Sequence, residues 1–206
     1  MCGRFKLGIS MEDILDIEEI LRQVEANIKE NTLSPYLVKE IDFYPGSQAP
    51  LLTSDGLKVM HWGFPLEKKL VFNARSETLF EKNMFKVAAK SRRCLIPCTL
   101  FYEWQTTGKE KTKYEIETKD SLFYLGGIYG KTIDLKGNLM DSFAIITKAS
   151  QGDMVKIHHR EPLVVPKQNL VSFLKSTEEN QEEFLKYASP EFIYHPMEGQ
   201  KQLSLF

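Results

Sequence analysis

Residues 92–104 have the sequence Arg-Arg-Cys-Leu-Ile-Pro-Cys-Thr-Leu-Phe-Tyr-Glu-Trp, and this stretch is the most decisive one for the fold. Aliphatic and aromatic side chains dominate it, as is typical of a buried strand. It ends with a single carboxylate, Glu103, between aromatic residues. The stretch therefore predicts a strand at 93–104 that leads into a functional site, with Cys94 and Cys98 as buried strand residues.

Strand and helix patterns continue on both sides of this stretch. Ser10 precedes an acidic turn, and apolar residues then recur at helical spacing up to Ile28, which predicts an amphipathic helix at 11–30. Further helices are predicted around 80–88 and at 167–175 and 178–187, strands at 50–53, 57–62, 143–147 and 162–165, and a hairpin at 113–118 and 121–129. The mixture indicates an α+β fold: one domain with a mixed, largely antiparallel, barrel-like sheet flanked by helices. The domain is predicted to span residues 1–197, followed by a tail at 198–206.

Composition limits the class of protein. With 206 residues the chain can bury the core of one domain, and its net charge of −1 argues against coating nucleic acid by bulk attraction but permits a local basic groove. No apolar run is long enough to span a membrane and no signal-peptide pattern is present, so we expect the bacterial cytoplasm, with nucleoid association during action on DNA. The three cysteines show no metal-ligand spacing, and neither a metal nor a cofactor is expected.

Cys2 is the strongest candidate for chemistry. The chain begins Met-Cys-Gly-Arg, so removal of Met1 would leave Cys2 with a free amine and a thiol on adjacent carbons. Such a pair can condense with an aldehyde through the amine and close a thiazolidine ring through the thiol. An α-amine has a pKa near ~8, against ~10.4 for lysine, so more of it is neutral and nucleophilic at pH 7. Cysteine also occurs at position two by chance, and the remaining motifs must decide between these readings.

Four segments are more polar and aromatic than their surroundings require. They are Cys2-Gly3-Arg4, Asn73-Ala74-Arg75-Ser76-Glu77-Thr78, Phe101-Tyr102-Glu103-Trp104 and Ile157-His158-His159-Arg160. Each has a structural alternative when taken singly. Glu103 can be an exposed strand-end carboxylate, His158 a hydrogen-bonded core histidine, and Arg75 with Glu77 a structural ion pair.

Taken together and in order, these segments resemble the SRAP family, the SOS response-associated peptidase-like proteins that include abasic-site crosslinking proteins. Seven sequence motifs match the family pattern between residue 1 and about residue 165. They are Met-Cys-Gly-Arg at 1–4, Pro-Gly-Ser-Gln-Ala-Pro at 45–50, Trp-Gly-Phe-Pro at 62–65, Asn-Ala-Arg-Ser-Glu-Thr at 73–78, Arg-Arg-Cys-Leu-Ile-Pro at 92–97, Phe-Tyr-Glu-Trp at 101–104 and His-His-Arg-Glu-Pro at 158–162.

The resemblance implies a DNA-damage function. After removal of Met1, by an autocatalytic peptidase activity of the thiol or by a cellular aminopeptidase, the Cys2 amine would attack the aldehyde of an abasic site in single-stranded DNA. The thiol would then close a thiazolidine, and the crosslink would shield the lesion. The resemblance places Asn73, Glu103 and His158 around Cys2. By residue type, Glu103 suits general acid and base catalysis, His158 suits holding the sugar or moving a proton, and Asn73 suits a neutral hydrogen bond.

Binding of the DNA strand is expected from cations and aromatic rings. Arg4, Arg75 and Arg160 offer planar donors for phosphates, and Trp62 and Trp104 offer faces for unstacked bases, with core packing as the alternative for both tryptophans. Three positions depart from the family pattern. Glu161 stands where methionine is usual, Leu100 where glycine is common, and 66–69 lack a second tryptophan.

The tail ends Gln202-Leu203-Ser204-Leu205-Phe206, which looks like the peptide that binds the bacterial sliding clamp. In this interpretation Gln202 and Leu203 orient the extended peptide, and Leu205 and Phe206 insert into an apolar groove. The alternative is a tail folded back onto its own domain. The protein itself is expected to be a monomer.

Two other classes of function remain open at this stage. One is a cysteine peptidase in which the Cys2 thiol attacks a peptide bond with its own amine as base. The other is a module that binds single-stranded DNA without a covalent step, and this module would bind equally after Cys2→Ala. Aldehyde capture ranks first because it explains why the cysteine must be N-terminal.

Overall fold

The decisive stretch forms two strands that belong to different sheets, β8 (Arg93–Cys98) and β9 (Leu100–Thr107), in the computed structural model. The model describes residues 2–25, 39–134, 136–175 and 182–197. Thr99 joins the two strands, and both its backbone N–H (2.9 Å) and its hydroxyl (3.1 Å) donate to the carbonyl of Lys6. The prediction of strand structure at 93–104 is confirmed, but the segment is two strands rather than one because the chain passes from one sheet to the other at Thr99.

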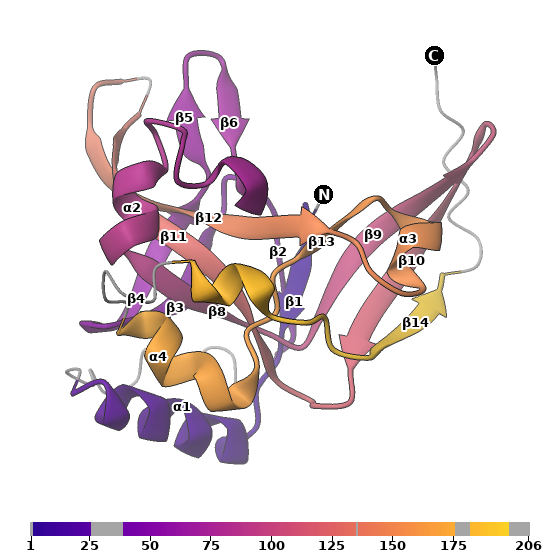
Figure 1. Ribbon diagram of the computed structural model, residues 1–206, viewed down its shortest axis with the longest axis horizontal. Helices are drawn as coiled ribbons and strands as arrows, with labels where there is room; N and C mark the ends of the chain where they lie inside the picture. The colour runs from indigo at the N-terminus through magenta and orange to yellow at the C-terminus, as the bar shows by residue number, and fades with distance from the viewer. Residues whose placement is uncertain (1, 26–38, 135, 176–181, 198–206) are drawn as a thin grey trace.

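A closed barrel of five strands forms one part of the fold (Figure 1). Its strands, in the order in which they pair, are β11 (Phe123–Ile133), β8, β3 (Gln48–Thr53), β4 (Gly56–Trp62) and β12 (Leu139–Ala149). The ring closes because β12 pairs with β11, and only the β4–β12 pair of the ring is parallel. The predicted α+β class with a mixed, barrel-like sheet is therefore confirmed, as are the predicted strands at 50–53 and 57–62.

Two short strands lie on opposite sides of β12 and position the candidate site. On one side β7 (Asn73–Arg75) runs parallel to β12, with Thr147 opposite Arg75. On the other side β13 (Arg160–Pro162) runs antiparallel, with Thr147 opposite Pro162. The predicted strand at 143–147 lies within β12. The one at 162–165 is displaced, since only Pro162 belongs to β13 and Val164 makes an isolated bridge to Leu125.

A second, antiparallel sheet of five strands stands beside the barrel. Its strands, in order, are β14 (Phe192–Pro196), β10 (Glu110–Thr118), β9, β1 (Phe5–Leu7) and β2 (Ile41–Phe43). The predicted hairpin of 113–118 with 121–129 is wrong. β10 instead turns back onto β9 through Gly108, whose φ of 63° lies in the left-handed region that glycine adopts without strain, while β11 joins the barrel.

Helices cover one end of the barrel, where α4 (Leu170–Leu174) packs between α1 (Met11–Gln23) and β8 (Figure 1). A capping box begins α1, because the Ser10 hydroxyl accepts from Asp13 N and the Asp13 carboxylate accepts from Ser10 N. The helix ends earlier than the predicted 30, since Glu25 has a left-handed φ of 57°; residues 26–30 lie outside the described residues.

The remaining helical segments are short. They are η2 (Ser76–Thr78), α2 (Lys86–Ser91), α3 (Met154–Ile157), η3 (Lys167–Asn169) and η5 (Glu183–Lys186). The predicted helix at 80–88 is thus largely a set of turns before α2. The helix at 167–175 is confirmed as η3 followed by α4, and of the helix at 178–187 only a 3-10 turn is observed, with 176–181 outside the described residues. Within the part of the chain that the structure describes, no helix has the length and apolar character needed to cross a membrane.

Aromatic residues fill the core where β4 meets the N-terminal strand. Trp62 has no exposed surface, and it packs against Phe5, Phe72 and Phe143. The next residue, Gly63, precedes the hairpin of β5 (Phe64–Leu66) and β6 (Lys69–Val71). Its φ is 121°, and a Cβ atom there would lie 2.4 Å from Leu70 Cγ, so this position requires glycine.

Candidate active site at the N-terminus

The N-terminal segment reaches the site because β1 pairs with β9. Phe5 lies opposite Phe101, and the Tyr102 N–H donates to the Arg4 carbonyl at 3.0 Å. This antiparallel register carries the two residues before Arg4 toward Glu103. Cys2 is fully buried and Glu103 is 2% exposed. The alternative of an exposed strand-end carboxylate for Glu103 is therefore wrong.

Asn73 contacts the backbone of Cys2 directly. It begins β7, and its Nδ2 donates to the Cys2 carbonyl at 2.9 Å. Its Oδ1 is buried and accepts no hydrogen bond from any described residue. One end of the amide thus fixes the N-terminal segment, and the other end leaves an acceptor beside it.

The surroundings of Cys2 keep its thiol protonated. Burial raises the pKa of the thiol far above its usual range, and the negative charge of Glu103 raises it further. The pairing of β1 with β9, in which Tyr102 N–H donates to the Arg4 carbonyl, brings Glu103 to the segment that bears Cys2. A thiol in this environment is not a ready thiolate nucleophile near neutral pH.

His158 is held by the main chain of Arg160. The residue follows α3, and its Nδ1 lies 3.0 Å from both the N–H and the carbonyl oxygen of Arg160. Gln105 of β9 holds α3 in place, because its Nε2 donates to the Lys156 carbonyl at 2.7 Å. The segment that bears His158 is therefore anchored to the same strand that bears Glu103.

The three arginines expected to bind phosphate lie in different environments. Arg4 makes two hydrogen bonds to Asp42, at 2.8 and 3.1 Å, and its guanidinium lies over the rings of Tyr44 and Tyr102. Arg160 is 6% exposed, whereas Arg75 is exposed.

Arg160 has a carboxylate partner from η2, the turn that follows β7. Its guanidinium forms a two-pronged ion pair with Glu77, with Nη2 2.9 Å from Oε2, and Nη2 also donates to the Thr147 carbonyl at 2.6 Å. The hydrogen bonds from Arg160 hold the pKa of Glu77 below its usual range, against the opposing effect of burial. The sequence suggested an ion pair of Glu77 with Arg75. The structure corrects the partner to Arg160.

The two tryptophans also separate. Trp62 is a core residue with its indole N–H donating to the Phe72 carbonyl at 3.0 Å, so the expectation that a base stacks on it is wrong. Trp104 is half-buried and stays a candidate for stacking.

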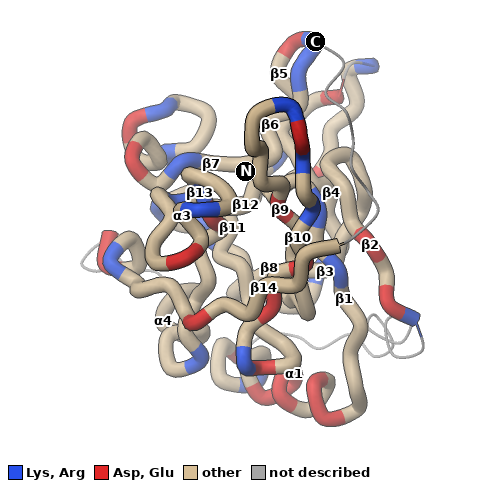
Figure 2. The backbone as a smooth tube through the Cα atoms, turned by 90° about the vertical axis from the view of Figure 1, so that its right-hand side faces the viewer, with Lys and Arg blue, Asp and Glu red and all other residues tan. Residues whose placement is uncertain are grey.

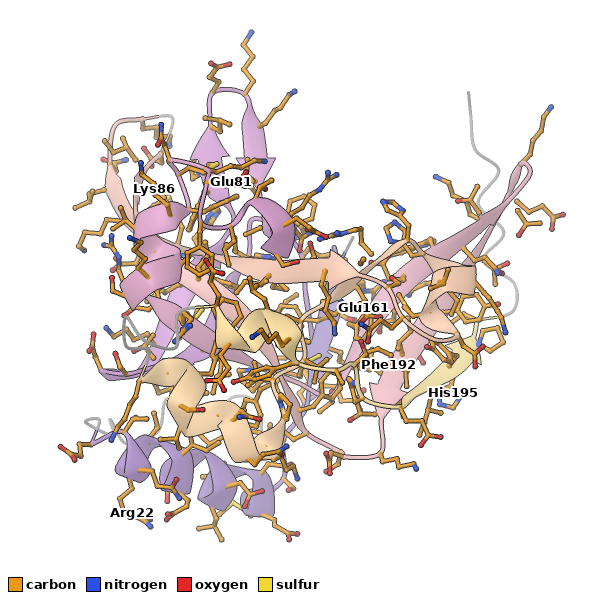
Figure 3. The ribbon with its side chains drawn as sticks, in the orientation of Figure 1. Arg22, Glu81, Lys86, Glu161, Phe192 and His195 are labelled. Atoms are coloured by element: carbon orange, nitrogen blue, oxygen red, sulfur yellow. The ribbon has the colours of Figure 1, made fainter. Side chains whose placement is uncertain are left out.

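Glu161 points away from the site and into the fold. It has no exposed surface, and it pairs with Lys148, which lies opposite it on β12, at 3.6 Å. It also accepts from Gln151 N at 3.2 Å and from the Ser189 hydroxyl. Figure 3 shows Glu161 in the interior, on the side of Phe192. This departure from the family pattern therefore places a carboxylate in the interior, where neighbouring groups enclose its charge.

Three residues around the site, Asp42, Glu77 and His159, were not predicted from the sequence to be site residues. Glu77 and Asp42 neutralise the arginines, and His159 is exposed with its ring centroid 4.4 Å from that of His158. Partial desolvation, His158 and the charges of Arg160 and Arg75 lower the pKa of His159. The duplicated histidine at 158–159 was the one sequence signal for this neighbour.

Charge is unevenly distributed around the molecule. Figure 2 shows the acidic residues of α1 at the end of the molecule opposite β7 and β13, and basic residues near β13 and β6. The acidic end formed by α1 is thus separate from β7 and β13, the strands next to Asn73 and His158 in the sequence.

Fold and site together define a class of protein: α+β barrels in which a cysteine at position 2 of the sequence is enclosed next to an amide and a carboxylate. The chain belongs to the SRAP family, since the family model described as SOS response associated peptidase (SRAP) matches residues 1–200.

Curated relatives agree with this membership, and a solved structure shares the fold. Abasic site processing protein YobE of Bacillus subtilis (strain 168) is 31% identical over 211 residues, covering 94% of this chain and 86% of the relative. Abasic site processing protein YedK of Escherichia coli (strain K12) is 29% identical over 175 residues, covering 80% and 75%. A crystal structure of a Bacteroides thetaiotaomicron protein has a TM-score of 0.74 at 23% identity, covering 95% of this chain and 92% of that one. The structural likeness establishes the shared fold.

Proposed function

We propose that this protein recognises abasic sites in single-stranded DNA and crosslinks to them through Cys2 after removal of Met1. The observation that carries the proposal is the enclosure of Cys2, whose carbonyl accepts from Asn73 and whose thiol lies near the buried Glu103. Relatives named abasic site processing proteins support the same substrate.

The proposed reaction forms two bonds and releases one water. The Cys2 amine adds to the aldehyde carbon of the opened sugar, and loss of water from the carbinolamine gives a Schiff base. The thiol then adds to the imine carbon, forming the C–S bond, and its proton ends on the nitrogen. The product is a thiazolidine with the mass of the Met1-less protein plus the DNA minus water.

The residues around Cys2 suit this order of steps. The amine adds first, because loss of water from its carbinolamine creates the imine carbon that the thiol then attacks. Glu103 is placed to give a proton to the departing oxygen and to take the thiol proton during ring closure. The unpartnered Oδ1 of Asn73 offers an acceptor for the amine, and His158 would hold the sugar or its phosphate.

Among the expected phosphate contacts, the structure favours Arg75. Arg4 and Arg160 are already neutralised by Asp42 and Glu77, so a phosphate would have to displace a carboxylate from either of them. Arg75 is exposed, so it would bind a phosphate without first giving up a carboxylate partner. The half-buried Trp104 would supply a stacking face.

The test uses a single-stranded oligonucleotide with one abasic site, a denaturing gel and an intact mass. The expected result is a denaturation-resistant band with the mass given above, absent for Cys2→Ala and absent with a tetrahydrofuran analogue that lacks the aldehyde. Protein whose mass shows that Met1 is gone, and which still gives no band, would refute the proposal. If Cys2→Ala binds the abasic-site oligonucleotide as tightly as wild type and neither protein forms a covalent product, the protein is instead a non-covalent DNA-binding module.

A single-turnover peptidase step is a second proposed activity, supported by the description of the family as a peptidase. In this step the Cys2 site hydrolyses the Met1–Cys2 bond, consuming one water and releasing methionine. The protein would be synthesised in a cell-free system with methionine aminopeptidase inhibited, and its mass measured. Loss of Met1 from wild type but not from Cys2→Ala supports autocatalysis, whereas retention in both refutes it.

We further propose that residues 202–206 bind the sliding clamp, and these residues lie outside the described residues. Deletion of 202–206 should abolish binding to purified clamp and leave crosslinking intact. Clamp binding that survives the deletion would refute this role of the tail.

A further inference from the structure

The ion pair between Glu77 and Arg160 joins two parts of the candidate site across a strand. Glu77 belongs to η2, directly after the strand that begins with Asn73, and Arg160 begins β13, two residues after His158. Strand β12 lies between β7 and β13 and pairs with both through Thr147. The guanidinium of Arg160 crosses β12, donating to the Thr147 carbonyl on the way to Glu77.

The main chain of Arg160 fixes the position of the His158 ring. Both the N–H and the carbonyl oxygen of Arg160 lie 3.0 Å from His158 Nδ1. Any shift of the Arg160 backbone would move His158 with it.

The side chain of Arg160 depends on Glu77 for its position. The residue is 6% exposed, and its Nε is buried without a hydrogen-bond acceptor among the described residues. A buried cation that loses its carboxylate is strongly destabilised in place and would move toward water. Removing the charge of Glu77 should therefore release the Arg160 side chain and loosen the backbone that holds His158.

We propose that Glu77 and Arg160 are positioning residues for His158: the ion pair braces β13 against the end of β7 and so fixes His158 relative to Asn73 and Cys2. This inference rests on the proposed crosslinking function. It gives Arg160 a task that its burial permits, whereas the exposed Arg75 is left to bind phosphate.

Four variants of the full chain separate positioning from binding. Glu77→Gln keeps the size and removes the charge, and Glu77→Asp keeps the charge on a shorter side chain. Arg160→Lys keeps the cation but loses the planar fork that contacts both carboxylate oxygens of Glu77. Glu81→Gln removes an exposed carboxylate four residues after Glu77 and serves as the matched control.

Affinity and reaction rate are measured separately. Affinity is measured with the tetrahydrofuran oligonucleotide, and the crosslinking rate with saturating abasic-site oligonucleotide. Glu77→Gln and Arg160→Lys should slow the saturated rate by at least about tenfold and change the affinity by less than about twofold. Glu77→Asp should recover part of the rate, and Glu81→Gln should match wild type.

A spectroscopic measurement follows His158 without any reaction. In protein labelled with ¹⁵N-histidine, the ring nitrogens of His158 should give one ordered set of signals in wild type, shifted or broadened in Glu77→Gln. Rates unchanged in both Glu77→Gln and Arg160→Lys would overturn the inference. So would an affinity that falls in Arg160→Lys with the saturated rate intact, because Arg160 would then be a phosphate ligand.

The two proposals can fail separately. If wild type forms no crosslink, the proposed function fails, and the His158 signals alone decide the inference. Signals unchanged by Glu77→Gln would then overturn it, and shifted signals would support it.

Discussion

Replacing both members of the buried Lys148–Glu161 pair with methionine should restore the stability that either single replacement removes. Glu161 has no exposed surface and Lys148 is 7% exposed, so each charge depends on the other and on a few hydrogen bonds. Removing one partner of a buried ion pair costs about 3–5 kcal/mol, because an uncompensated charge remains inside. Replacing both with apolar side chains of similar size ranges from neutral to a gain of about 1–4 kcal/mol.

The contacts of the pair make the two single variants different. Glu161→Met removes an acceptor from Gln151 N and the Ser189 hydroxyl, whereas Lys148→Met removes the donor to the Tyr187 carbonyl at 2.7 Å. Burial already lowers the pKa of Lys148, and Glu161 opposes that shift. Without Glu161 the folded protein should favour neutral Lys148. The unfolded chain then binds more protons, so the stability of Glu161→Met should rise with pH.

Urea unfolding followed by circular dichroism measures these changes. With a slope of about 2 kcal/mol per molar urea, each single variant should lower the midpoint by about 1.5–2.5 M, and the double variant should return to wild type or above it. Lys119→Met breaks an exposed pair with Glu191 and should change stability by at most about 1 kcal/mol. Single variants as stable as this control, or a double variant as unstable as the worse single one, would refute the reasoning.

Three further perturbations follow from the structure. Burial raises the pKa of Asp42 and hydrogen bonds from Arg4 lower it, and the net shift is downward. The Asp42 carboxylate therefore stabilises the fold above its unfolded pKa near ~3.9, and this stabilisation is lost as the pH falls through the folded pKa. Asp42→Asn should therefore flatten the acid limb of stability measured between about pH 5 and 2, and an unchanged limb would contradict the assignment. Gly63→Ala should destabilise by more than about 1 kcal/mol in thermal melts, because of its positive φ and the contact with Leu70; pairing it with Leu70→Ala should recover only the steric part. The hydroxyl of Tyr124 is buried without a partner among the described residues, so Tyr124→Phe should leave stability unchanged or raise it by about 1 kcal/mol, and a loss of that size would reveal a missed partner.

Local composition predicted most strands but not how they pair. The strands at 50–53 and 57–62 are short apolar runs bounded by turns, and they lie where the sequence indicates. The hairpin of 113–118 with 121–129 failed because two adjacent strands do not have to pair with each other. Because the chain turns at Gly108, β10 pairs with β9. The partners of β11 are β8 and β12, which come from other parts of the chain. Pairing is set by such long-range contacts, which a single sequence does not display.

The site divides in the same way. The resemblance named Asn73 and Glu103 as neighbours of Cys2, and the structure brings both to it. No sequence pattern joins Arg160 to Glu77, because their contact spans 83 positions and depends on β12 lying between them.

Arginine shows most clearly what residue type alone leaves undecided. Arg4, Arg75 and Arg160 have the same capacity to bind a phosphate, and the sequence gives no reason to rank them. The structure ranks them by what each guanidinium already holds, since Asp42 and Glu77 neutralise two of the three. A neutralised arginine stabilises the strands that it bridges, and it gains little from a phosphate that must replace a carboxylate. The availability of each arginine is therefore set by the acid that the fold places beside it, and for Arg160 this is the basis of our proposal that it supports His158.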